Sequence, residues 1–150
     1  MQLSLLKSGT EPYPEADQGE HIFTYSIYPH AGTVKESETV ALAYMLNNPM
    51  TAVKAAGSES SVPETYSVAY TDRANVILET VKEAEDSDAT VLRLYECKNI
   101  RSKTELTLGF PAEKCYLCDM LENEEKELPI KDGKVKLDIR GFEIVTLKVK

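Results

Sequence analysis

Short runs in which apolar and polar residues alternate, separated by turn-forming residues, dominate this chain. A period of two is typical of β-strands, because successive side chains of a strand point to opposite faces of the sheet. The runs predict strands over residues 3–7, 21–28, 52–56, 66–70, 76–84, 90–98, 104–108, 115–121, 135–139 and 144–149. Many short strands at nearly regular spacing predict an all-β fold, an antiparallel β-sandwich.

One stretch, residues 33–48, departs from this pattern. Its apolar residues recur at the spacing of an α-helix rather than of a strand. Thr33 and Glu36 have the S/T-x-x-E spacing of a capping box, which marks a helix start. The sequence NNP at 47–49 marks a stop. We therefore expect one short helix in a fold that is otherwise β.

The stretch 76–84 fits either a helix or a strand. Ile77, Val81 and Ala84 would align on one face of a helix. We favour a strand, because the sequence DSD at 86–88 then forms a hairpin turn into residues 90–98. The sequence KDGK at 131–134 predicts a second turn of this kind.

Composition and charge narrow the classes of function. The chain has 150 residues, 42% of them hydrophobic, which suits one domain or at most two small ones; we take residues 1–150 as one. The net charge of −8 disfavours nucleic acid and an anionic membrane surface as partners. No apolar run approaches the roughly 20 residues that a membrane-spanning helix needs.

The N-terminal sequence and the cysteine count bear on the compartment. MQLSLLKSG is too short and too polar for a signal peptide. Three cysteines, an odd number, cannot form a complete disulfide framework. Both observations favour a reducing cytoplasm. The first predicted strand begins almost at residue 1, so we expect a chain excised from a longer one.

Cys115 and Cys118 have the C-x-x-C spacing of zinc knuckles and redox pairs. They lie in a predicted strand, where residues three apart face opposite sides, so the two sulfur atoms would diverge. No glycine separates them, and Cys97 supplies only one further thiol. We therefore expect buried structural cysteines and no metal site on this chain.

Charged residues of the strands and turns have ordinary interpretations. Arg93 and Glu96 would face opposite sides of their strand, so we expect Arg93 to pair across to a neighbouring strand instead. One local concentration of acid stands out, and we interpret it as a solvated turn between strands. It consists of Glu122, Glu124, Glu125 and Glu127.

Asp17, Glu20 and His21 form the other candidate cluster for chemistry. They crowd a polar loop just before the predicted strand 21–28, and loops on a rigid sandwich often carry function. The cluster suits acid–base chemistry or sugar binding, but a polar turn of ordinary composition is the commoner case. His30, the only other histidine, stands at no recognisable metal-ligand spacing from His21. The sequence contains no P-loop, G-x-S-x-G, H-E-x-x-H or G-x-G-x-x-G motif, so the residues alone assign no catalytic site.

Five longer phrases, in order and over nearly the whole chain, resemble one family. They are EADQGEHIFTYSIYPH (15–30), ALAYMLNNPM (41–50), NVILETVKEAEDSDATVLRLYE (75–96), LTLGFPAEKCYLCDMLENE (106–124) and RGFEIVTLKVK (140–150). Together they resemble the C-terminal β-region of the α-mannosidases of glycoside hydrolase family 38, bacterial type. Within them, VKEAEDSD and LYE are the specific parts, whereas LGFP alone would be weak.

The resemblance implies an enzyme larger than this chain, a retaining exo-glycosidase. In the family, an aspartate nucleophile and a second carboxylate perform the hydrolysis, and a zinc held by Asp and His orients the mannose hydroxyls. Those residues lie in an N-terminal catalytic domain, and nothing in residues 1–150 matches them. We therefore expect a fragment that is inactive alone, with no catalytic residue or cofactor of its own. Its expected partners are that catalytic domain and, through it, a mannoside.

The resemblance also implies a role for the polar loop, because in the family a loop from this region can approach the sugar site. The matching side chains here, which would hydrogen-bond a mannoside hydroxyl or contact the catalytic domain, are Asp17, Gln18, Glu20 and His21. Two alternatives stay open. One is a free-standing carbohydrate-binding module, with Tyr13, Tyr28 and Tyr116 as platforms although tryptophan is absent. The other is a protein-interaction module.

Overall fold

The computed structural model of the chain describes residues 3–54 and 63–150. These residues belong to two compact units, Met1–His30 and Ala31–Lys150. Among the described residues, no helix has the length and apolar character needed to cross a membrane.

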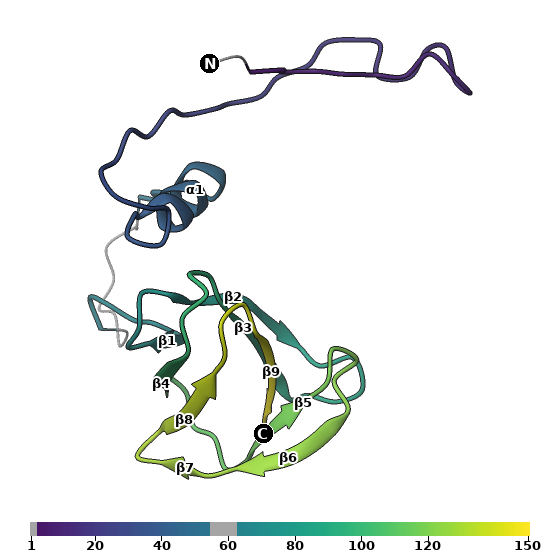
Figure 1. Cartoon of the computed structure of the whole chain (residues 1–150). Coiled ribbons are helices and arrows are strands. Elements are labelled where there is room, and N and C mark those ends of the chain that lie inside the picture. The colour runs from purple at the N-terminus through teal and green to yellow at the C-terminus, as the bar shows by residue number, and fades with distance from the viewer. Residues whose placement is uncertain (1–2, 55–62) are drawn as a thin grey trace. The chain divides into compact units, whose positions relative to one another are not determined.

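The second unit contains one helix followed by antiparallel strands (Figure 1). The elements are α1 (Thr39–Asn47), β1 (Ala69–Thr71), β2 (Val76–Glu83), β3 (Thr90–Glu96), β4 (Ser102–Leu108), β5 (Cys115–Cys118), β6 (Glu124–Leu128), β7 (Ile130–Lys131), β8 (Lys134–Ile139) and β9 (Ile144–Val149). One sheet has the order β1-β4-β8-β7 and the other has the order β2-β3-β9-β5-β6. The predicted class, an antiparallel β-sandwich with one short helix, is confirmed.

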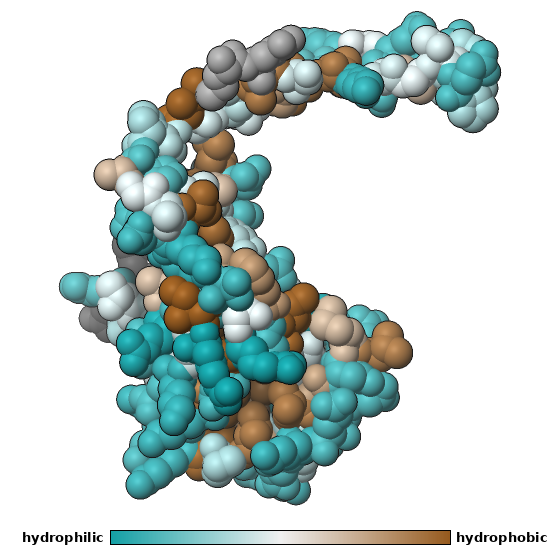
Figure 2. All heavy atoms as spheres, viewed as in Figure 1, coloured by the Kyte–Doolittle hydropathy of each residue, from teal (hydrophilic) through white to brown (hydrophobic). Residues whose placement is uncertain are grey.

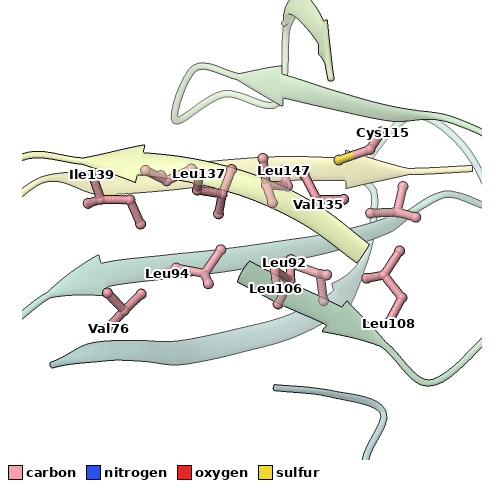
Figure 3. Close-up of a cluster of buried hydrophobic side chains, with 12 residues drawn as sticks. Val76, Leu92, Leu94, Leu106, Leu108, Cys115, Val135, Leu137, Ile139 and Leu147 are labelled. Atoms are coloured by element: carbon pink, nitrogen blue, oxygen red, sulfur yellow. The ribbon is translucent and has the colours of Figure 1, made fainter. Parts of the chain in front are cut away.

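The core lies between the two sheets, because each sheet turns one apolar face toward the other. Strand β8 shows the principle: its buried residues alternate with exposed, charged ones. Side chains from both sheets meet in a single cluster (Figure 3). Its members are Val76, Leu92, Leu94, Leu106, Leu108, Cys115, Val135, Leu137, Ile139, Val145, Leu147 and Val149.

The two turn predictions and the choice of a strand at 76–84 are confirmed. Strand β2 pairs with β3 in antiparallel register, from Val76 opposite Glu96 to Glu83 opposite Thr90. The DSD sequence therefore closes a hairpin, as expected. At the second turn Asp132 and Gly133 both adopt a positive φ, 52° and 70°, which matches the twist of the flanking strands β7 and β8.

The predicted strands at 3–7 and 21–28 are not present in the structure. The residues carry no ladder pairing within the described part of the chain, and they are exposed throughout. Alternation alone does not make a strand, because a strand also needs a neighbour for its backbone groups and a surface for its apolar face. For the predicted strand 52–56, residues 52–54 are not in a strand either, while residues 55 and 56 lie outside the described residues.

The helix begins later than the capping signal indicated. Thr33 donates from its backbone N–H and from Oγ1 to Oε2 of Glu36, at 2.8 and 3.1 Å. This pair closes a turn that precedes the helix, which starts only at Thr39. The predicted stop is confirmed, because the helix ends at Asn47, two residues before Pro49.

The interpretation of the acidic run as a solvated turn is wrong. Glu124, Glu125 and Glu127 lie in β6, an edge strand that pairs with β5. An edge strand with exposed side chains needs no alternation, and charge on it blocks pairing with other chains. The fourth glutamate, Glu122, is buried before this strand.

We predict that the inter-sheet cluster carries most of the stability of the second unit. Leu147→Ala should lower the free energy of unfolding by about 2–5 kcal/mol, because it leaves a cavity where the side chain is fully buried. Leu121→Ala, at a leucine that is 82% exposed, should change it by no more than about 0.5 kcal/mol. Urea unfolding followed by circular dichroism measures both. Equal effects of the two substitutions would contradict the described core.

Candidate functional site

The polar loop predicted to bind sugar lies in the first unit and is built from tight turns. The backbone N–H of Gln18 donates to the carbonyl oxygen of Glu15 at 3.2 Å. Asp17 has a φ of 56°, in the left-handed region that aspartate tolerates better than most residues. Gly19 follows with a φ of 133°, where a side chain would be strained. The local sequence therefore suits this chain reversal.

Two of the four predicted side chains bond to the backbone of the loop itself. Gln18 Nε2 donates to the carbonyl oxygen of Pro14 at 3.1 Å, and His21 Nε2 lies 2.6 Å from the carbonyl oxygen of Asp17. The carboxylates of Asp17 and Glu20 make no hydrogen bond within the described residues, and both residues are exposed. The structure thus places the four side chains in one exposed loop. Their role in binding a substrate stays a prediction.

The second unit holds a buried carboxylate, Glu96 at the end of β3, whose burial was not predicted from the sequence. It is 1% exposed and accepts hydrogen bonds from Asn75 Nδ2 and from the backbone N–H groups of Lys98 and Phe142, at 2.8, 2.8 and 3.0 Å. Burial by itself would raise the pKa of Glu96, but these hydrogen bonds outweigh it and the pKa is lowered. Glu96 therefore stays charged without a cationic partner.

A second buried carboxylate, Glu122, lies in the loop between β5 and β6. Its Oε1 accepts from Lys82 Nζ at 2.8 Å and its Oε2 accepts from the backbone N–H of Glu85 at 3.0 Å. The pair with Lys82 is the main reason why the pKa of Glu122 is lowered. Asp119 shapes the same loop, because its carboxylate accepts from the backbone N–H groups of Leu121 and Asn123.

Arg93 makes the cross-strand contact that the sequence analysis expected. Its Nε donates to Oγ1 of Thr146 on β9 at 3.3 Å, and its Nη2 donates to the carbonyl oxygen of Met120 at 3.4 Å. The Met120 sulfur in turn lies 3.8 Å from Oγ1 of Thr146. The loop after β5 is thus held against strands β9 and β3 as well as β2. The guanidinium of Arg93 makes its hydrogen bonds within this arrangement.

The cysteines behave as structural residues. Cys115 and Cys118 are both buried, and a register shift between Leu117 and Cys118 interrupts the regular alternation of β5. Burial raises the pKa of the Cys115 thiol to about 12 and also raises that of Cys118. Neutral thiols are poor metal ligands and poor nucleophiles. Within residues 3–54 and 63–150, no group of three His, Cys, Asp or Glu side chains could hold a metal ion.

A shallow groove of about 410 Å³ opens beside the end of β3. Its lining is mostly apolar and includes Tyr95 and Phe142, with Glu79, Arg93 and Glu96 as charged groups. Arg93 is already bonded to neighbouring strands, and Glu96, which also lines the groove, is bonded to backbone groups. The groove therefore offers an apolar surface rather than a pair of free carboxylates for hydrolysis.

Comparison with known proteins decides the family. Residues 75–147 match the sequence model of the glycosyl hydrolases family 38 C-terminal beta sandwich domain. Residues 75–147 belong to this family. The family 38 match begins at Asn75 and ends at Leu147, so it spans strands β2 to β8 and most of β9.

Whole-chain comparisons agree with the family 38 match. The chain is 36% identical to Alpha-mannosidase 2C1 of Homo sapiens over 153 residues, which cover 98% of this chain and 14% of that protein. It is 34% identical to the Mus musculus protein of the same name and 30% identical to Alpha-mannosidase G of Dictyostelium discoideum. The chain spans about 14% of the length of these relatives. All three are eukaryotic, so the bacterial type stays a prediction.

The buried carboxylates connect the phrases that carry the family 38 resemblance. Glu122, in the phrase LEN, accepts hydrogen bonds from Lys82 and from the backbone N–H of Glu85, which both lie in the phrase VKEAED. Glu96, in the phrase LYE, accepts hydrogen bonds from Asn75 and from the backbone N–H of Phe142, which lies in the phrase RGFE. These residues therefore join one part of the family 38 sandwich to another and have no free group for catalysis.

A signal for one of these carboxylates was present in the sequence. Glu96 shares a strand face with Leu92 and Leu94, which predicts an inward carboxylate, and such a group must be hydrogen-bonded. Glu122 had no comparable signal, because it lies outside any strand and its partners are 37 and 40 residues away.

We predict that acid destabilises the second unit through its paired carboxylates. The folded-state pKa of Glu122 lies below the ordinary value of 4.5, so its charge contributes stability above that pH. This contribution is lost as the pH falls below about 4.5 and through the folded pKa. Glu122→Gln should be less stable than the parent at pH 7 and should lose less stability between pH 7 and pH 3. Urea midpoints at the two pH values measure this.

Glu125→Gln is the matched control, because Glu125 is an exposed glutamate of β6. Its pH dependence should run parallel to that of the parent chain. If Glu122→Gln also ran parallel to the parent, the pair with Lys82 would not contribute to the acid sensitivity.

Proposed function

We propose that this chain is a non-catalytic C-terminal β-sandwich domain of a retaining, zinc-dependent α-mannosidase. The observation that carries the proposal is the family 38 match, together with relatives named α-mannosidases that align with 97–98% of the chain. The described carboxylates point the same way, because those buried in the sandwich are all bonded to groups of the sandwich itself.

In this proposal the chemistry belongs to the remainder of the enzyme, and the sandwich packs on the catalytic domain. Zinc, when bound in such an enzyme, orients the sugar hydroxyls. The described residues of this chain do not fit a zinc site, because no group of three suitable ligands converges among them. No step of the reaction is therefore assigned to them. The three free cysteines suit a reducing compartment, and we propose the cytoplasm.

We further propose that the loop with Asp17 and Glu20 contributes to the sugar site of the whole enzyme. The two carboxylates are exposed and make no hydrogen bond within the described residues, so they are available as acceptors for sugar hydroxyls. His21 and Gln18 support the loop by bonding to its backbone. In this proposal the loop binds a mannoside only in the complete protein, together with the catalytic domain.

The alternative of a free-standing carbohydrate-binding module receives less support. Such a module needs aromatic rings with a free face, and Lys150 Nζ lies 5.2 Å from the centre of the Tyr116 ring. Tyr28 stands beside His30, with ring centres 5.5 Å apart. Tyr13, which is largely exposed, is left as a single platform among the three tyrosines considered.

We predict that hydrolysis requires more than these 150 residues. The isolated chain should show no turnover of a nitrophenyl α-mannoside, with or without added zinc, because none of its residues matches the catalytic residues of the family. The full-length protein should hydrolyse the same substrate and lose activity on treatment with a chelator. Release of nitrophenol measures both. Zinc-dependent turnover by the isolated chain would overturn the proposal, and so would a full-length protein that hydrolyses no α-mannoside.

The role of the loop predicts a selective effect in the full-length protein. Asp17→Asn and Glu20→Gln should each lower kcat/KM by about tenfold, the effect of losing one charged hydrogen bond to a sugar hydroxyl. Glu125→Gln, an exposed substitution in β6, should leave kcat/KM unchanged. Steady-state kinetics with the nitrophenyl substrate provides the measurement. Full activity of both loop variants would remove the loop from the site.

A further inference from the structure

Residues 21–28 have the sequence of a strand but not the contacts of one. Phe23, Tyr25 and Ile27 form one apolar face, and the other face is mixed, with Thr24 and Ser26 between Ile22 and Tyr28. The residue types are aromatic and β-branched, which strands favour. Yet the segment makes no ladder pairing with any described residue, and its side chains are exposed.

Exposing the apolar side chains of this segment to water is unfavourable in free energy. Ile27 is 67% exposed, Tyr25 58% and Phe23 49%. Figure 2 shows brown, hydrophobic side chains among the hydrophilic ones along the first unit. Residues 22–28 contain no charged side chain and no proline, the two devices by which proteins protect a free strand from pairing. A strand of this kind is suited to a paired position in a sheet.

The helix that follows in the sequence is also exposed in a way that suggests a missing cover. Helix α1 has the sequence TVALAYMLN, apolar around most of its circumference, but none of its residues is buried. A helix with this composition is normally covered by protein on several sides. Throughout residues 3–54 only Ser37 is buried. The relatives that align with 98% of this chain devote only 14% of their length to it, so in them much further chain is available as a cover.

We propose that residues 21–28 form a β-strand by adding to the edge of a sheet in the remainder of the parent polypeptide. Phe23, Tyr25 and Ile27 would be buried in the core of that sheet, and Thr24 and Ser26 would face away from it. The backbone N–H and C=O groups of the segment supply the ladder, as in other cases of strand addition. The pairing also fixes the position of the preceding loop with Asp17 and Glu20. The proposal rests on the proposed function, in that the chain belongs to a larger enzyme.

Hydrogen–deuterium exchange with mass spectrometry tests the proposal in the full-length protein and in the 150-residue chain. Alternate amides of residues 22–28, those that donate to the neighbouring strand, should exchange about a hundredfold or more slowly in the full-length protein, because each must wait for local opening of the ladder. In the 150-residue chain they should exchange near the rate of an unfolded peptide. Fast exchange in the full-length protein would overturn the proposal.

Two substitutions distinguish the buried face from the exposed one. Tyr25→Asp places a charge in the proposed core, so protection of residues 22–28 should be lost in the full-length protein. Ser26→Asp places the same charge one residue further, on the outward face, and protection should persist. Amides of β3 should stay protected in both variants, because the sandwich core is separate. Equal behaviour of the two variants would overturn the assignment of the faces.

Two further outcomes would also overturn the proposal. Protection of residues 22–28 in the dilute 150-residue chain would mean that the segment pairs within this chain. Protection that appears there only as the concentration rises would mean that a second copy is the partner. Loss of mannosidase activity is not a readout, so exchange data can support the strand even if the full-length protein proves to have another activity.

Discussion

The hydrogen bonding of the buried Glu96 carboxylate is the constraint on which the sandwich depends most. A carboxylate removed from water must find donors, because an uncompensated buried charge costs more than a domain of this size can sustain. Glu96 obtains them from the start of β2, from the turn after β3 and from the approach to β9. Asn75, which donates to it, also donates to Ser102 on β4 and so links the two sheets. One side chain therefore positions the ends of strands from both layers.

A similar argument explains the loop between β5 and β6. Glu122 accepts hydrogen bonds from Lys82 and from the backbone just after β2, and Arg93 donates a hydrogen bond to the carbonyl oxygen of Met120. The loop would otherwise be an exposed hairpin at the sheet edge. Together with the Glu96 network, this loop brings phrases of the family 38 resemblance that are far apart in the sequence into contact: LEN with VKEAED, and LYE with RGFE. Their residues act as structural ties, and the sandwich is best understood as a scaffold.

The first 54 residues pose the opposite case. Their apolar side chains are as frequent as those of a folded region, but the described residues provide no core for them. The α-mannosidases that resemble this chain are about seven times longer, as their 14% coverage implies. In contrast to the sandwich, residues 3–54 bury only Ser37 among the described residues.

The sequence by itself determined the fold class, the strands from β2 to β5 and from β8 to β9, the hairpin turns and the end of the helix, because these depend on local period and turn chemistry. It also placed Arg93 across from a neighbouring strand and Cys115 and Cys118 in the interior. Tertiary structure alone decided what depends on a distant partner. The edge strand β6 exists because β5 offers its backbone, and Glu122 is buried because Lys82 lies across the sheet. For the same reason residues 21–28 are not a strand here: their alternation specifies two faces, but only a neighbouring strand can supply the hydrogen bonds.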